Sequence, residues 1–322
     1  MSSLPCLSRS LAATAFCALV ACAPGERVSE PLDTPVAPVP PVDEEPPPPF
    51  EPTDPGDLAW IPAGYGPEEP VLVVFIGDSI SKGNGASDNS LAYDTLLWSN
   101  TEAAYPDWVG RDLLSRYVSI ERGVDVAVEG ATTQTALDAS LPALDTWLDD
   151  TWPDGIPGSA VVFLTIGGND LQQALLPSSD PAAIADDTLA RLEALVDALL
   201  SPERFPLGVT LYATNVYEPS GGIGQSSCFF GYEYSRVLAD LDAYNVQVRD
   251  LAEDRGFAAI DLYSAFRLHG ADAAVPGAPV SDPDDPTRWF APDCIHPNDR
   301  GHHEIRRMMW EALMQGPTQV GG

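Results

Sequence analysis

The chain has 322 residues, of which 48 are Asp or Glu and 16 are Lys or Arg, so its formal net charge is -32. A surface this acidic repels polyanions and anionic lipid headgroups, which argues against nucleic acid as a partner. The length permits one large domain or two modest ones, and a hydrophobic content of 44% is sufficient for a substantial core.

Residues 1–21 have the form of an export signal. Arg9 precedes an apolar run, residues 11–21, which is too short to span a bilayer and suits the core of a signal peptide. An ordinary cleaved signal has this form. Small residues leading directly to Cys22 also resemble the bacterial lipoprotein signal, which implies cleavage before Cys22 and lipidation of its thiol. Ala23 then implies the outer membrane. We therefore expect an exported protein whose only membrane contact is an N-terminal lipid anchor in the bacterial envelope.

Residues 22–57 differ sharply in composition from the rest of the chain. Twelve prolines occur in the 34 residues between Pro24 and Asp57, with Asp and Glu among them. Such a segment cannot bury a core and favours extended polyproline II structure. We expect a disordered tether that holds the following domain, residues 58–322, away from the membrane.

Apolar runs alternate with helical patterns through this domain. The runs are continuous, which is typical of strands covered on both faces, and lie at 71–76, 124–128, 160–166, 208–213 and, more weakly, 257–262. The helical patterns lie at 108–117, 133–148, 182–200, 235–255 and 299–314. This alternation predicts a three-layer α/β/α domain with a parallel sheet of about five strands. The site of such a domain lies beyond the carboxyl ends of its strands.

The first run ends in Gly77-Asp78-Ser79 and continues into small residues. Gly77 permits a sharp turn after the strand, which would present the Ser79 hydroxyl as a nucleophile. If a helical turn begins there, its N–H groups and dipole favour negative charge beside Ser79. The alternative is that Asp78 or Ser79 only caps a helix, a position that these residue types favour.

A second polar loop, DCIHPN at 293–298, precedes the last helical pattern. A serine hydroxyl becomes nucleophilic when a base removes its proton, and a carboxylate can orient that base and stabilise the imidazolium. Asp293 and His296 would supply the carboxylate and the base. Alternatively, Asp293 only forms a turn, and Asn298 or Asp299 caps the helix.

Two further strand ends carry candidate donors for an oxyanion. Gly167 and Gly168 precede Asn169, whose amide is a neutral donor suited to developing negative charge. Gly130 follows the second run, where a bare backbone N–H could approach a substrate oxygen. The alternatives are a helix cap at Asn169 or Asp170 and an ordinary left-handed turn at Gly130.

The order and placement of these four motifs resemble the SGNH (GDSL-type) hydrolase family. GDSI at 77–80 resembles its first block, Gly130 lies at the second, GGND at 167–170 resembles the third and DCIHPN at 293–298 resembles the last. The resemblance covers about residues 70–315. It implies a flavodoxin-like fold with strand order 2-1-3-4-5.

The resemblance also implies a role for each matched residue. Ser79 would be the nucleophile, His296 the general base and then acid, and Asp293 the carboxylate that orients it. The backbone N–H groups of Ser79 and Gly130 and the side chain of Asn169 would form the oxyanion hole. No metal or cofactor is implied.

Two other groups of reactive side chains need separate explanations. His302, His303 and Glu304 lack the H-E-x-x-H spacing of a zinc site, and we expect them on a polar helix face. Cys228 and Cys294 are the cysteines that remain after the signal is removed and Cys22 is lipidated. In an oxidising compartment we expect them to form a disulfide, and two free thiols are the alternative.

The sequence therefore predicts a monomeric serine esterase that cleaves carboxylic esters through an acyl-enzyme. We expect a small-molecule or carbohydrate ester rather than a lipid, because the tether sets the domain away from the membrane and no long apolar lid is evident. Acyl transfer to a sugar hydroxyl is the same chemistry. The alternative is a catalytically silent envelope- or carbohydrate-binding lipoprotein on the same fold, which we would expect to have lost a site residue.

Overall fold

The computed structural model describes residues 58–100, 103–225, 234–276, 278 and 280–315. All of them fall in the unit formed by residues 51–322. The predicted signal, the lipidation of Cys22 and the tether at 22–57 lie outside the described residues and stay predictions. In the part that is described, no helix is both long and apolar enough to cross a membrane.

A six-stranded sheet with the order β1-β6-β5-β4-β2-β3 forms the centre of the fold. The strands are β1 (Ala59–Trp60), β2 (Leu72–Gly77), β3 (Arg122–Asp125), β4 (Ala160–Thr165), β5 (Val209–Thr214) and β6 (Ala258–Ile260). The last five are parallel and correspond to the five predicted runs, so the predicted order is confirmed. The antiparallel edge strand β1 was not predicted, because two residues are too few to leave a pattern.

Both faces of the sheet are buried, which explains why its strands are apolar without alternation. In β2, Leu72 and Ile76 pack into the core on one face, and Val73 and Phe75 pack into the core on the other. Successive strand side chains point to opposite faces, so each must be apolar when helices cover both. Each such side chain contributes roughly 1.5–3 kcal/mol by its burial.

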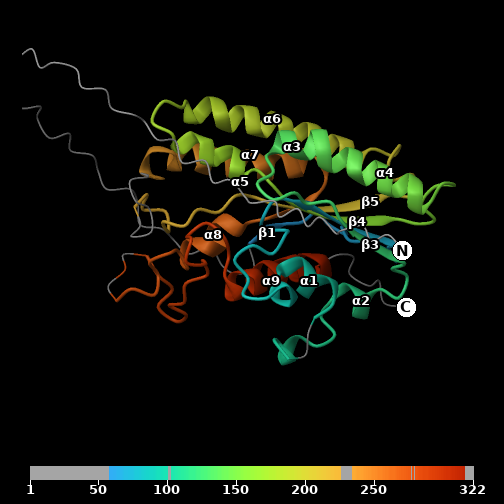
Figure 1. Ribbon diagram of the computed structural model, residues 1–322, viewed down its shortest axis with the longest axis horizontal. Coiled ribbons are helices and arrows are strands. Elements are labelled where there is room, and N and C mark those ends of the chain that lie inside the picture. The colour runs from blue at the N-terminus through green and yellow to red at the C-terminus, as the bar shows by residue number, and fades with distance from the viewer. Residues whose placement is uncertain (1–57, 101–102, 226–233, 277, 279, 316–322) are drawn as a thin grey trace, which may run out of the picture. The chain divides into compact units, whose positions relative to one another are not determined.

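Helices cover the sheet as two layers (Figure 1). One layer packs on the core that contains Leu72, and comprises α3 (Thr133–Thr135), α4 (Leu141–Thr151), α6 (Pro181–Leu200) and α7 (Leu238–Arg255). The other packs on the core that contains Phe75, and comprises α1 (Tyr93–Trp98), α2 (Leu113–Arg116), α8 (Leu262–Arg267) and α9 (Asp299–Met314). The predicted three-layer architecture is therefore confirmed.

Two predicted helices differ from the structure for local reasons. The pattern at 133–148 runs from α3 through a π-helical segment, Ala136–Ser140, into α4. Pro142 lacks the N–H that an α-helix would use at this point, which is compatible with the wider turn. The pattern at 108–117 is not one helix, because Gly110 adopts a left-handed φ of 78° and only the single turn of α2 follows it.

Candidate active site

Ser79 lies in the turn that follows β2, at the carboxyl edge of the sheet. The turn is closed by hydrogen bonds from Lys82 N to Asp78 O and from Asn84 N to Ser79 O, at 3.2 and 2.9 Å. The first of these bonds closes a single helical turn, as we considered, but no regular helix follows it. The glycine before the turn is needed for space, since a Cβ on Gly77 would lie 2.3 Å from the Ser81 hydroxyl oxygen.

A relay of three side chains joins the two ends of the domain. His296 Nε2 lies 2.9 Å from the Ser79 hydroxyl oxygen, across 217 residues of sequence. On the other side of the ring, His296 Nδ1 lies 2.6 Å from Asp293 Oδ2. The structure thus brings the predicted nucleophile, base and carboxylate into one hydrogen-bonded row.

Asp293 is held as an acceptor by its own loop. Its Oδ1 accepts hydrogen bonds from the backbone N–H groups of Ile295 and His296, both at 3.0 Å. Burial alone would raise the pKa of this carboxyl, but the hydrogen bonds from the His296 ring and from these N–H groups outweigh it, so the pKa is lowered. The ionised Asp293 then accepts the Nδ1 proton, which leaves the Nε2 lone pair facing Ser79.

Neighbouring residues fix the position of this loop. Asn298, one of the two residues that we considered as the cap of α9, accepts a hydrogen bond from Gly301 N at 3.0 Å. Its Nδ2 donates to Arg288 O at 2.8 Å. The Tyr217 hydroxyl donates to Ile295 O at 2.9 Å from the segment after β5. These bonds tie the residues on both sides of His296 to different parts of the fold.

Cys294 lies between Asp293 and His296 and is buried. It adopts a left-handed φ of 61°, takes part in a disulfide, and its sulfur lies 3.2 Å from the Arg288 guanidinium. The predicted partner, Cys228, lies outside the described residues, so the pairing of these two cysteines stays a prediction.

The candidate oxyanion donors lie on adjacent loops. Asn169 is in the first turn of α5 (Gly168–Gln172), and its Nδ2 donates to Ala131 O at 2.9 Å. The same nitrogen lies 3.4 Å from Asp78 Oδ2. Gly130 adopts a left-handed φ of 72° with open space where a Cβ would lie, so backbone conformation rather than crowding favours glycine there.

Asp170 is a further site residue for which we had considered only a helix cap. Its buried carboxylate accepts from the backbone N–H and hydroxyl of Thr133, at 2.8 and 2.7 Å, and lies 3.3 Å from the Arg191 guanidinium. Because Thr133 begins the helix after the Gly130 turn, this contact joins the loops that carry Gly130 and Asn169. In the sequence, Asp170 was recognisable only as an acidic residue directly after Asn169. Its partners could not be inferred, because Thr133 and Arg191 lie 37 and 21 residues away from it.

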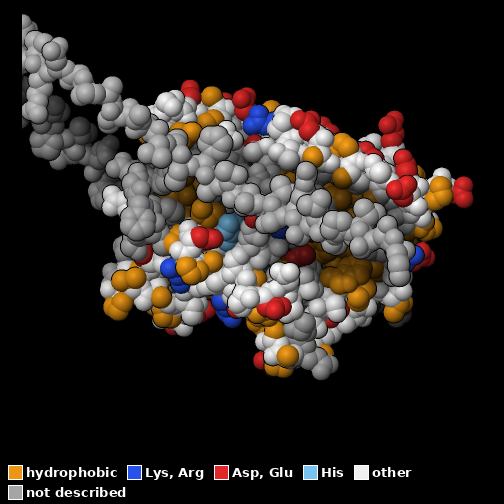
Figure 2. Space-filling view, in the orientation of Figure 1, with side chains coloured by type: hydrophobic (Ala, Val, Ile, Leu, Met, Phe, Trp, Pro, Cys, Tyr) orange, Lys and Arg blue, Asp and Glu red, His pale blue; other side chains and the backbone are white. Residues whose placement is uncertain are grey.

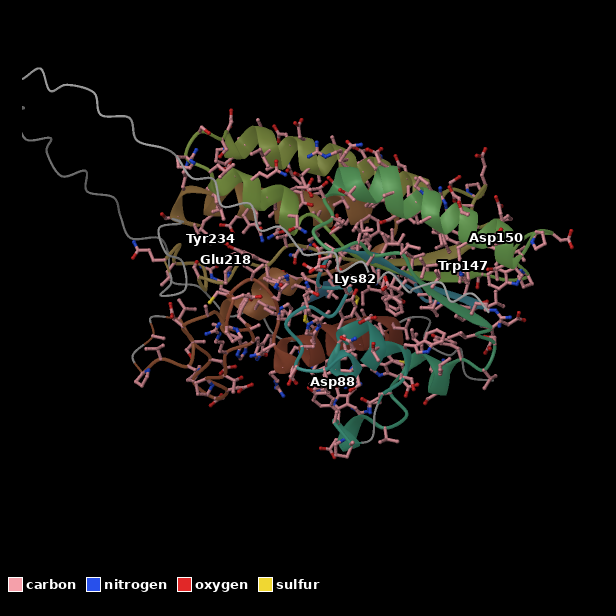
Figure 3. All side chains as sticks on the ribbon, in the orientation of Figure 1. Lys82, Asp88, Trp147, Asp150, Glu218 and Tyr234 are labelled. Carbon is pink, nitrogen blue, oxygen red and sulfur yellow. The ribbon has the colours of Figure 1, made fainter. Side chains whose placement is uncertain are left out.

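A pocket of about 920 Å³, including its open mouth, begins at Ser79 and His296. Most of the exposed wall surface is apolar, with contributions from Ile166, Leu171, Leu175, Val216, Val237 and Leu241, and polar side chains such as Gln172, Asn215 and Asp240 also line the pocket. Glu218 and Tyr234, which also line it, are seen at the end of the sheet where the parallel strands finish, and Trp147 and Asp150 mark the opposite end (Figure 3). This placement is the one expected for a parallel sheet.

The face of the molecule in Figure 2 carries more acidic than basic side chains, in keeping with the net charge.

The expectation of a polar face at His302, His303 and Glu304 was wrong, because all three are buried. His302 Nε2 lies 3.0 Å from Asn84 O, and the His303 ring stacks on Tyr105 at 3.9 Å. Burial lowers the pKa of His302 to about 4, so its ring packs as a neutral group. Within the described ranges, no group of three or more His, Cys, Asp or Glu side chains could hold a metal ion.

Gly85 approaches the His296 loop closely enough to be tested by substitution. A Cβ on Gly85 would lie 2.2 Å from Pro297 O and 2.8 Å from His296 Cβ, at a φ of 93°. We expect Gly85→Ala to displace His296 and lower kcat by about 10²-fold, since a shift of 1 Å can have that effect. Steady-state hydrolysis of a p-nitrophenyl ester would measure it.

Gly155→Ala is the matched control for this substitution. Gly155 has a similar φ of 98° but no atom within 4 Å of the added Cβ, so it carries the backbone strain without the contact. Equal kcat values for the two variants would mean that the approach of Gly85 does not position His296.

The sequence model of the GDSL-like Lipase/Acylhydrolase family matches residues 75–304. No curated protein matches the chain. Among solved structures, an extracellular lipase from Streptomyces rimosus is 20% identical, with 76% of this chain and 99% of that chain covered and a TM-score of 0.46.

Two other solved structures are similar to the same extent. The acetyl xylan esterase AlAXEase is 18% identical, covers 76% of this chain and 100% of its own, and has a TM-score of 0.49. Phospholipase A1 from Streptomyces albidoflavus NA297 is 20% identical, with 76% and 98% coverage and a TM-score of 0.45. The family match spans most of the chain and confirms the resemblance stated from its motifs; the protein therefore belongs to the GDSL-like lipase/acylhydrolase family of ester hydrolases.

Proposed function

We propose that the protein hydrolyses carboxylic esters with Ser79 as the nucleophile, His296 as the base and Asp293 as the orienting carboxylate. The observation that carries the proposal is the row of two contacts, 2.9 Å from Ser79 to His296 and 2.6 Å from His296 to Asp293. These are the distances over which a base can take a hydroxyl proton and a carboxylate can fix its tautomer.

The reaction follows from this row in two halves. His296 Nε2 takes the Ser79 proton as the oxygen attacks the ester carbonyl, and the resulting oxyanion is met by the N–H groups of Ser79 and Gly130 and by Asn169 Nδ2. His296 then protonates the departing alcohol, leaving Ser79 acylated. A water, activated by the same ring, attacks the acyl-enzyme and releases the acid. Another alcohol in place of water would give acyl transfer.

The pocket favours an apolar acyl group longer than acetyl. It begins at Ser79 and Asn169, and aliphatic side chains such as Leu171, Val216 and Leu241 form much of its wall. An alkyl chain in such a pocket gains about 0.8 kcal/mol for each buried CH₂. The proposal therefore keeps the small-molecule or carbohydrate ester that we expected from the sequence, and adds an aliphatic acyl group, which the sequence did not identify.

A series of p-nitrophenyl esters with acyl chains of two to eight carbons tests this acyl group, since the leaving group stays constant. We expect kcat/KM to rise by at most about fourfold for each CH₂ added over the first few carbons, because burial of one CH₂ contributes about 0.8 kcal/mol. A steady decline from acetate onward would reject the apolar acyl group, although the ester hydrolase itself would stand.

Labelling with a fluorophosphonate tests the nucleophile separately. We expect one adduct, located on the Ser79 peptide by mass spectrometry, and loss of that adduct in His296→Ala. An adduct on another serine would reject Ser79. The alternative of a silent binding protein is disfavoured, because none of Ser79, Asn169, Asp293 and His296 has been replaced.

A further inference from the structure

Asn169 can donate to an oxyanion only if its amide nitrogen, and not its amide oxygen, faces the reacting centre. The two atoms occupy nearly the same space, so their surroundings decide which way the amide points. Asn169 Nδ2 has two acceptors in reach, Ala131 O at 2.9 Å and Asp78 Oδ2 at 3.4 Å. An amide oxygen in that place would be repelled by both.

We propose that Asp78 is a positioning residue that keeps the Nδ2 of Asn169 directed at the oxyanion position. This inference rests on the proposed function, because it assigns a task within the same oxyanion hole. In the resting enzyme the carboxylate of Asp78 accepts a hydrogen bond from Asn169 Nδ2, and during the reaction the substrate oxygen replaces it as the acceptor as it gains charge. The long distance of 3.4 Å suits a contact that must be released.

The backbone N–H of Ile80 determines which carboxylate oxygen of Asp78 faces Asn169. Its Oδ1 accepts from the backbone N–H of Ile80 at 2.9 Å, which leaves Oδ2 as the atom that faces Asn169. An ionised carboxylate has no hydrogen to donate, so both of its oxygens act only as acceptors. A neutral isostere could not present an acceptor to Ile80 and to Asn169 at the same time.

The surroundings of Asp78 indicate that a carboxyl is costly at this position. Asp78 is 3% exposed, and within the described residues no Lys or Arg forms an ion pair with it. Burial raises its pKa to about 6, the Ile80 N–H and His296 partly offset that rise, and Asp170 adds to it. The carboxylate is thus ionised at pH 8, where both of its oxygens are acceptors.

Asp78→Asn tests the proposal because it reverses polarity without changing volume. The new amide oxygen is expected to stay with the Ile80 N–H, so the new NH₂ group faces Asn169 Nδ2 and favours rotation of that amide. At pH 8 we expect kcat to fall about 10-fold or more with KM within about twofold, since the lost contact acts on the transition state.

A double-mutant cycle separates positioning from a general structural effect. In the Asn169→Ala background, Asp78→Asn should cause no further loss of kcat, because the amide on which it acts is gone. An equal loss in both backgrounds, or an unchanged kcat in the single variant, would overturn the proposal. If Asp78→Asn does not fold, Asp78→Ala removes the acceptor and enters the same cycle.

Asp94→Asn is the matched control for the loss of a buried negative charge. Asp94 lies on α1, outside the pocket wall, and burial likewise raises its pKa to about 6. We expect its kcat to equal that of the wild type. Wild-type activity in Ser79→Ala would reject the proposed function itself, whereas an inactive Ser79→Ala together with a fully active Asp78→Asn would reject only the role of Asp78.

Discussion

Ser79→Ala is expected to lower kcat for p-nitrophenyl butyrate by roughly 10⁴–10⁶-fold, to a level that the oxyanion donors alone sustain. The hydroxyl oxygen lies 2.9 Å from His296 Nε2, and nothing else in the described part of the site offers a nucleophile in that contact. The loss should fall on kcat with little change in KM, because the wall that binds the acyl group is untouched. Single-turnover hydrolysis by the purified variant would measure it.

The fold should survive this change, which keeps the result interpretable. Ser79 is 8% exposed, and its replacement removes one hydroxyl, at a cost of about 1 kcal/mol in the free energy of unfolding. Ser119→Ala is the matched control, since the Ser119 hydroxyl donates to Pro70 O at 3.0 Å, just before β2 begins. Turnover by Ser79→Ala at the level of this control would rule out Ser79 as the nucleophile.

The parallel sheet was predictable because its signal is local. Runs such as 71–76 and 160–166 are apolar at every position, which marks a strand buried on both faces, and the strand order came from the resemblance to a known family. The strand β1 (Ala59–Trp60) carries no such signal, because its place depends on hydrogen bonds to Ile260 and Ala259 nearly two hundred residues later. Local pattern also missed the burial of His302, whose partners lie on another segment.

The sequence was sufficient to select the residues of the candidate site but not to describe what surrounds them. Short motifs selected Ser79, Asn169 and His296 as candidates, and the structure adds the 2.9 Å distance between Ser79 and His296. The apolar pocket could not be anticipated, since its wall is assembled from single residues on separate segments, such as Leu171 and Leu241. The contact between Asp78 and Asn169 was hidden for the same reason, as 91 residues separate the two side chains.

Asp293→Asn is expected to lower kcat by about 10²–10⁴-fold through the tautomer of His296. The new amide oxygen would stay with the N–H groups of Ile295 and His296, which now bind Oδ1, so its NH₂ group would face Nδ1. Nδ1 must then accept, and the ring hydrogen moves to Nε2. That nitrogen lies 2.9 Å from the Ser79 oxygen and would donate to it, where catalysis requires an acceptor.

Stability at low pH provides a second readout of the same contact. The pKa of Asp293 is lowered below its usual 3.8, so in the wild type this carboxylate stabilises the fold above that pH and loses the contribution as the pH falls through the lowered value. Asp293→Asn should remove this contribution at neutral pH, and the difference in the free energy of unfolding between variant and wild type should shrink below about pH 4. Urea unfolding at pH 7 and pH 3 would measure the difference.

Asp282→Asn is the control that separates the ring contact from the loop contacts. Asp282 Oδ1 also accepts from two backbone N–H groups, those of Asp284 and Asp285 at 2.8 and 3.2 Å. The substitution thus also replaces a carboxylate that accepts from two backbone N–H groups by an amide, but in a loop outside the relay. If the two variants had equal kcat values, the 2.6 Å contact to Nδ1 would not set the tautomer of His296, and Ser79 would have to be activated without Asp293.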